Sequence, residues 1–265
     1  MLKKLLKIEF RSISRTLLPL MSGVLLLCLV TRLLKLASDT FSFCNDNPLF
    51  RILLSLTSVV TALGLAAAAI VCVILCLARF YRMLGQEGYL MLTLPVTMTQ
   101  QIAAKLIAAL CSSAVTLVFL QLCGRVVTGS DININFEFGL PSVQAVPAML
   151  MLFVILLLVA AGWFLFAYLC IAIGSHWSQQ RLVGSILVYI VLSFILQIAA
   201  IAVVILLAFF SIKSSLIPVF NTWVADQPTL ALYLILGVCL LICAAIDAIL
   251  WAVTQYLLTH KLNLP

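Results

Sequence analysis

Six long apolar runs dominate the chain, and shorter polar segments separate them. The runs cover residues 17–36, 53–77, 106–122, 146–173, 182–210 and 230–250. A helix needs roughly 20 apolar residues to cross the hydrocarbon core of a bilayer. A membrane β-barrel would instead show short segments in which apolar and polar residues alternate. The pattern therefore predicts an all-α polytopic membrane protein, with six transmembrane helices in a single domain, residues 1–265.

Composition agrees with this class. Of 265 residues, 65% are hydrophobic and 9% are charged, whereas soluble domains have roughly 45–50% and about 25%. A soluble protein is therefore excluded. We expect a lipid bilayer around the chain and no nucleic-acid partner.

The sequence offers little catalytic chemistry. It contains no G-x-x-x-x-G-K-[ST], H-E-x-x-H or G-x-S-x-G motif, the patterns of phosphate binding, zinc hydrolysis and acyl transfer. Eight of its nine cysteines lie inside or at the edge of apolar runs, and its two histidines are far apart. Such cysteines are typically small buried apolar residues. We expect no catalytic residue, no metal site and no cofactor bound by this chain.

Residues 1–16 predict an amphipathic helix at the membrane interface. Its cations would face anionic lipid, as in helices that lie in the headgroup region. Glu9 falls on the apolar side, where an acid is costly without a partner. A simpler alternative is that the positive charge only retains the N-terminus on its side of the membrane. The apolar face has Leu2, Leu5, Leu6, Phe10 and Ile13, and the basic face Lys3, Lys4, Lys7, Arg11 and Arg15.

The distribution of Lys and Arg predicts the orientation, because cytoplasmic connections are enriched in both. With the N-terminus inside, ten of the 15 basic residues are cytoplasmic and five are outside. Both termini are then cytoplasmic. The inner set is Lys3, Lys4, Lys7, Arg11, Arg15, Arg79, Arg82, Lys105, Arg181 and Lys261; the outer set is Arg32, Lys35, Arg51, Arg125 and Lys213.

The polar segment 79–105 is longer than a simple turn requires. It contains three basic residues, one acid, two glycines and a Leu-Pro break, and its aromatic residues are of the kind that dominate protein interfaces. Thr97-x-x-Gln100 resembles a capping box that opens the third helix. We expect a partner to bind here; the alternative is a membrane-surface helix without a protein partner. The expected docking residues are Arg79, Tyr81, Arg82, Glu87 and Tyr89.

Small residues follow one face of the second run. Gly64, Ala68, Cys72 and Cys76 recur at a spacing of four, and such stripes allow helices in lipid to approach closely. Packing within the chain is the first interpretation of this stripe. Contact with a second subunit is the alternative.

Asp247 is the one acid inside an apolar run. A charge at such depth is expensive and needs a partner or a function. Lys105 is expected at the same level of the membrane, so we predict an intramembrane pair of Lys105 and Asp247. A proton or ion relay is the alternative, although no second intramembrane acid accompanies Asp247.

The segment 79–105 also resembles the corresponding part of the permease subunits of bacterial ABC-type exporters. The resemblance rests on RFYRML…EGYL…TLPVT…K, with support from LLKIEFRSISRTLLPL near the N-terminus and IAIGSHW…RLVGSILVYIV from 171 to 191. With six spans and no large outer domain, it covers essentially the whole chain. It implies two six-helix subunits side by side, identical or not. It also implies a cytoplasmic ATPase bound to each subunit through short coupling helices, one of them in the segment between spans 2 and 3.

On this basis we expect the permease subunit of an ATP-driven exporter in the bacterial cell membrane. The chain is then not an enzyme, because its ATPase partner holds ATP and Mg²⁺. One alternative is a gradient-driven carrier or channel that uses Asp247. Another is a non-transporting immunity or assembly protein.

Overall fold

The computed structural model describes residues 2–40, 48–84, 98–129, 142–175, 181–213, 223 and 227–260. This part of the chain is helical and contains no strand. All six of its helices are long and apolar enough to cross a membrane, as expected of a polytopic membrane protein. They are α1 (Leu2–Thr40), α3 (Pro48–Leu84), α5 (Met98–Thr128), α6 (Ser142–Gly174), α7 (Arg181–Lys213) and α9 (Pro228–His260).

Every helix extends beyond the apolar run that predicted it. Hydropathy marks the part of a helix that suits hydrocarbon, but the helical hydrogen bonds continue into the polar interface. The largest correction concerns the segment 79–105. Residues 79–84 belong to α3 and residues 98–105 to α5, so the connection between these helices is 85–97. That connection, with Glu87 and Tyr89, lies outside the described residues.

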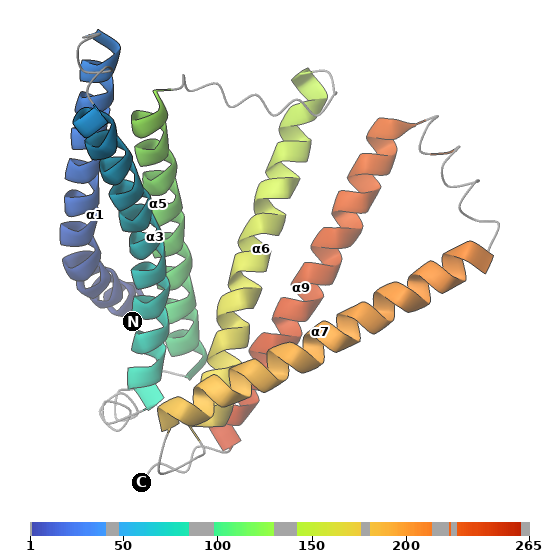
Figure 1. Ribbon diagram of the computed structural model, residues 1–265. Helices are drawn as coiled ribbons and strands as arrows, with labels where there is room; N and C mark the ends of the chain where they lie inside the picture. Colours follow the sequence, from blue (N-terminus) through green and yellow to red (C-terminus); the bar gives the residue numbers. More distant parts are fainter. Residues whose placement is uncertain are drawn as a thin grey trace. The chain divides into compact units, whose positions relative to one another are not determined.

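The expected interfacial helix 1–16 is not a separate element. One helix, α1, runs from Leu2 to Thr40 with Pro19 inside it. Its 39 residues would span about 58 Å, well beyond the roughly 30 Å of a hydrocarbon core. Proline inside a helix removes one backbone hydrogen bond and favours a bend, and Figure 1 shows α1 curving in its N-terminal part.

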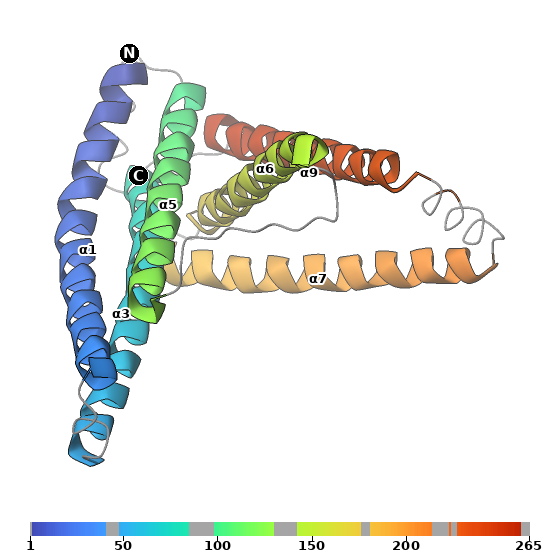
Figure 2. The ribbon, with the colours of Figure 1, turned by 90° about the horizontal axis from the view of Figure 1, so that it is seen from above.

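The chain divides into two compact units. Unit 1 comprises residues 1–82 and 94–135, and unit 2 comprises residues 83–93 and 136–265. In unit 1, α1, α3 and α5 lie side by side (Figures 1 and 2). A core of Val24, Cys28, Ala68 and Cys123 joins all three helices.

Two basic side chains of α1 lie at the C-terminal end of α5. The Lys35 ammonium donates a hydrogen bond to the Val127 carbonyl oxygen, with 3.0 Å between Nζ and O. Gly129 follows α5 with a φ of +70°, and its N–H bonds to the Arg125 carbonyl at 2.8 Å. This left-handed cap favours glycine. A Cβ at Gly129 would also lie 2.8 Å from Cζ of Arg32. Cations at a helix C-terminus satisfy free carbonyls and oppose the helix dipole.

Unit 2 contains α6, α7 and α9. Helices α6 and α9 run close together in both views, and α7 meets α6 near the start of α7 and then diverges from it (Figures 1 and 2). At the junction, a Cβ on Gly174 would collide with the main chain of Ser185. One turn further along α7, the rings of Phe166 and Tyr189 lie 5.5 Å apart. Glycine at 174 thus allows α6 and α7 to touch at the backbone.

Candidate functional site

A buried cluster of charged residues lies where α1, α3 and α5 of unit 1 meet. We call Glu9, Ser12, Arg79 and Lys105 the Glu9 cluster. The exposed fraction of the side chain is 9% for Glu9, 16% for Arg79 and 6% for Lys105. Glu9 occupies the buried face of α1 together with Ile13. Charges buried to this degree require partners with good geometry.

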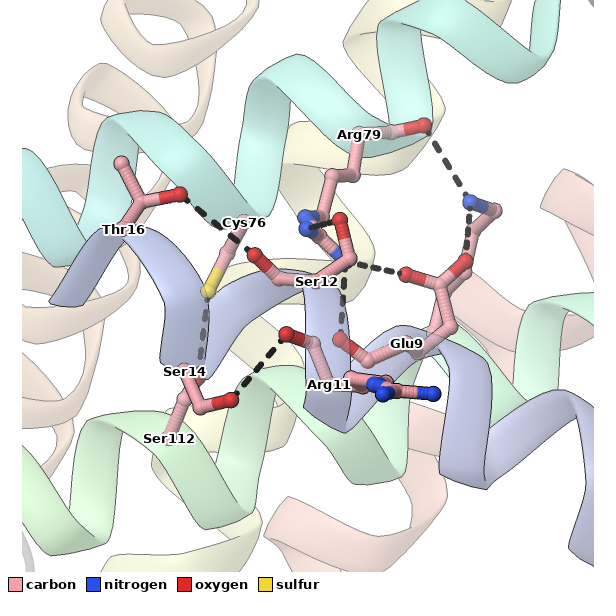
Figure 3. A network of polar contacts seen from close by, with 9 residues as sticks. Glu9, Arg11, Ser12, Ser14, Thr16, Cys76, Arg79 and Ser112 are labelled. Carbon is pink, nitrogen blue, oxygen red and sulfur yellow. Dashed lines mark hydrogen bonds and ion pairs between the residues drawn. The ribbon is translucent and has the colours of Figure 1, made fainter. Parts of the chain in front are cut away.

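Both oxygens of the Glu9 carboxylate are bound by cations. Arg79 donates from Nη1 to Oε2 at 2.7 Å, and Lys105 donates from Nζ to Oε1 at 2.9 Å. Figure 3 shows the Arg79 side chain extending from α3 toward Glu9 and Ser12 of α1. Such charge-assisted hydrogen bonds are about twice as strong as neutral ones. One acid therefore joins three helices.

Further hydrogen bonds reinforce this arrangement through the main chain. Arg79 Nη1 also donates to the Glu9 carbonyl oxygen at 2.9 Å, and Nη2 donates to the Ser12 hydroxyl. Lys105 Nζ donates to the Arg79 carbonyl oxygen at 3.2 Å. The link from α3 to α1 thus has contacts that do not need the carboxylate, whereas the hydrogen bond from Lys105 to α1 ends on the carboxylate itself.

A small cavity adjoins the Glu9 cluster. Its volume is about 10 Å³, and its lining residues are Glu9, Ile13, Cys76, Arg79, Lys105, Ala108 and Ala109. Space of this size suits about one water molecule. The cavity is therefore too small for a transported substrate, and the arrangement is suited to holding helices together.

The stripe of small residues on α3 faces the interior of unit 1. A Cβ at Gly64 would lie 3.7 Å from Leu27 and 3.8 Å from Val24 of α1, and Ala68, Cys72 and Cys76 are buried. Thr116 of α5 donates to Cys72 Sγ at 3.3 Å, and Ser112 Oγ lies 3.3 Å from Cys76 Sγ. Each hydroxyl also bonds to a carbonyl of α5. The stripe therefore packs within the chain.

The described docking candidates lie at the end of α3 and differ in exposure. Arg82 is exposed and Tyr81 is half-buried, so both have surface that a partner can reach. The guanidinium of Arg79 is already bound to α1. Glu87 and Tyr89 lie outside the described residues, so their role stays a prediction.

Asp247 of unit 2 lies against the backbone of α6. A Cβ at Gly162 would be 2.5 Å from Asp247 Oδ1, and Oδ2 is buried without a hydrogen-bond partner among the described residues. Lys105 has a partner, Glu9, in its own unit. A bond from Lys105 to Asp247 would join the two units and stays a prediction.

The sequence contains a signal for the Glu9 cluster that hydropathy and membrane depth do not capture. Glu9 is the one acid of α1, α3 and α5 apart from Asp39 near the other end of α1. Arg79 lies near the end of α3 and Lys105 near the start of α5, on either side of the connection 85–97. Glu9 is therefore the one acid of these three helices that could pair with both cations. Over the described ranges, no group of three His, Cys, Asp or Glu side chains is placed to hold a metal ion.

Comparison with known proteins gave no match to this chain among family models, curated proteins or solved structures.

Proposed function

We propose that the chain is the permease subunit of an ATP-driven ABC-type exporter, with the connection 85–97 as the site where a cytoplasmic ATPase binds. The sequence resemblance supports this proposal, as do six helices suited to a membrane. The chain has no nucleotide-binding motif of its own, so the energy comes from a partner.

The observation that carries the proposal is the Glu9 cluster. A connection that only reversed the chain would not need its two flanking helices joined through one buried carboxylate. Arg79 precedes the connection and Lys105 follows it, and both bind Glu9 of α1. A buried ion pair is costly to assemble and is weak evidence for stability alone. When α3 and α5 are held together in this way, a protein that binds the connection can act on both helices at once.

Purification of the chain from native membranes in a mild detergent tests the proposal. We expect a soluble subunit with Walker A and signature motifs to co-purify, and its ATP hydrolysis to depend on the permease. A matched control is the same purification at high salt, because charged contacts at a protein surface are screened by salt and the ATPase should be depleted. Permease-dependent transport that follows an ion gradient, with no ATPase present, would contradict the proposal.

A gradient-driven carrier is the second candidate, and Asp247 favours it. The buried Oδ2 atom of Asp247 lacks a partner among the described residues, and an acid inside a membrane is a candidate for coupling to protons or cations. Loss of gradient-driven transport in Asp247→Asn, with folding preserved, would support this function. Transport that survives the substitution would exclude it.

A further inference from the structure

The Glu9 cluster contains more positive than negative charge. Arg79 and Lys105 are two cations and Glu9 is one carboxylate, so the net charge of the cluster is +1. Among the described residues of unit 1, the other acid is Asp39, which lies near the opposite end of α1. A buried charge is costly unless an opposite charge accompanies it. One positive charge of the cluster therefore lacks a counter-charge within the described part of unit 1.

The cluster also has a hydrogen-bond donor that is not yet used. The Lys105 ammonium has three N–H groups, and two of them donate to the Glu9 carboxylate and the Arg79 carbonyl oxygen. Its third N–H has no acceptor among the described residues, although the Lys105 side chain is only 6% exposed. Donors buried to this degree almost always have an acceptor. We therefore expect an acceptor at Lys105 that these residues do not provide.

The small cavity lies directly beside this donor. Lys105 and Arg79 both line it, and its volume is about 10 Å³. The space suits about one water molecule, and a chloride ion is of similar size. Glu9 lines the cavity as well, but each of its carboxylate oxygens is already bound by a cation. The cavity therefore combines excess positive charge, an available N–H donor and room for one small ion.

We infer that this cavity binds one small monovalent anion of the chloride type, held by the Lys105 ammonium. The anion accepts the third N–H of Lys105 and balances the positive charge that the Glu9 carboxylate leaves. A water molecule would accept the same hydrogen bond but would not balance the charge. The inference does not depend on an ATPase or on transport, because the whole site lies within α1, α3 and α5 of unit 1.

Thermal unfolding of the full chain in detergent tests this site. The midpoint is measured in sodium chloride and in sodium gluconate at equal ionic strength, because gluconate has the same charge but is far too large for the cavity. A ligand that binds the folded state stabilises it increasingly as its concentration rises. We expect the midpoint to rise with chloride and not with gluconate. Equal midpoints in the two salts would mean that water occupies the cavity, and would overturn the inference.

Two substitutions in the cluster should change the response to chloride in opposite directions. Lys105→Met removes the ammonium and brings the net charge to zero, so the difference between chloride and gluconate should disappear. Glu9→Gln raises the net charge to +2, so chloride should bind more tightly. The increase should be at least about fivefold, the factor for one unit charge roughly 4 Å away at the dielectric constant of water. General destabilisation would instead lower the midpoint alike in both salts.

Lys35→Met is the matched control, because it removes a lysine that binds Val127 near the opposite end of α1. This variant should keep the full response to chloride. A response that survives Lys105→Met, or that weakens in Glu9→Gln, would contradict the assigned site. Bromide in crystals of the unsubstituted protein tests the site even if Lys105→Met does not fold. Its anomalous X-ray scattering should place the ion next to Lys105 Nζ, and bromide bound only elsewhere would refute the site.

Discussion

The carboxylate of Glu9 is bound through each of its oxygens to a different helix. Because the site is largely buried, removing the carboxylate leaves two cations without compensation, and breaking a buried pair in this way typically costs about 3–5 kcal/mol. The two cations are not equivalent. Arg79 has additional contacts with the main chain of Glu9 and with Ser12, whereas the bond of Lys105 to α1 is with the carboxylate.

We predict that Glu9 and Lys105 are energetically coupled. Unfolding of the purified protein in detergent should show Glu9→Gln and Lys105→Met each destabilising the protein. The double variant should lose less than the sum of the two, with a coupling of about 0.5–3 kcal/mol. The second substitution removes the Lys105 charge that Glu9→Gln leaves without a carboxylate, so Lys105→Met costs less in that background than in the unsubstituted protein.

Lys35→Met combined with Glu9→Gln provides the control, since Lys35 binds α5 at its opposite end and its effect should add to that of Glu9→Gln. The cycle of Lys105→Met with Asp247→Asn measures whether Lys105 also interacts with Asp247. Additive losses for Glu9 and Lys105, together with coupling between Lys105 and Asp247, would contradict the partner assigned to Lys105.

At the scale of the helices, unit 2 depends on a close contact between α6 and α7. A Cβ on Gly174 would collide with the main chain of Ser185, and side chains cannot relieve a collision with the backbone. Helices in lipid associate largely through such close packing, because burial from lipid offers no hydrophobic gain. The close packing of α6 against α7 therefore requires glycine at position 174.

We predict that Gly174→Ala destabilises unit 2 by about 1–3 kcal/mol, the usual cost of forcing extra volume into a packed contact. The measurement is the unfolding midpoint of the purified protein. Gly237→Ala is the matched control, since Gly237 is in α9 of the same unit and has no atom within 4 Å of an added Cβ. Alanine there should be neutral or slightly stabilising, because it favours a helix. Similar losses in both variants would refute the assigned contact.

The sequence contained enough information for the helices but not for their ends. Apolar runs of sufficient length located all six helices, because few side chains other than apolar ones suit the bilayer core. The boundaries at 79–84 and 98–105 were wrong because Arg79, Arg82 and Lys105 are polar yet continue the helices. Helix α5 begins at Met98, and Thr97 lies outside the described residues, so its capping role stays a prediction.

The charge cluster was only partly predictable, for a different physical reason. Periodicity placed Glu9 on the apolar face of its helix and so showed that it needed a partner. It did not identify that partner, because a helical period defines a face but not the helix that packs against it. Expected depth in the membrane suggests Asp247 as the partner of Lys105. Depth alone, however, does not distinguish Asp247 from Glu9 as that partner.

For the whole molecule, the proposed function requires a cytoplasmic connection 85–97 and an outer connection 41–47. We predict that a membrane-impermeant maleimide labels Cys44 in intact cells. Gln86→Cys, in a chain that also has Cys44→Ser, should react only after the cells are permeabilised. The physical reason is the excess of Lys and Arg expected on the cytoplasmic side. The opposite pattern would place the connection 85–97 outside, where no ATPase is available.

The most direct test of the central claim is the rate of ATP hydrolysis by the co-purified ATPase when Glu87→Ala and Tyr89→Ala are introduced together. An acid in a basic groove and a rigid aromatic side chain are typical anchors of an interface. Losing one desolvated charge pair costs roughly 2–5 kcal/mol, or tens- to thousands-fold in affinity. Glu137→Ala with Phe138→Ala is the matched control, a similar change between the third and fourth apolar runs, where the predicted orientation places the connection outside. We expect insertion and folding to be normal in both variants, while the Glu87 and Tyr89 variant loses the ATPase or its stimulation. Unchanged association and hydrolysis in that variant would show that the connection 85–97 is not where the ATPase acts.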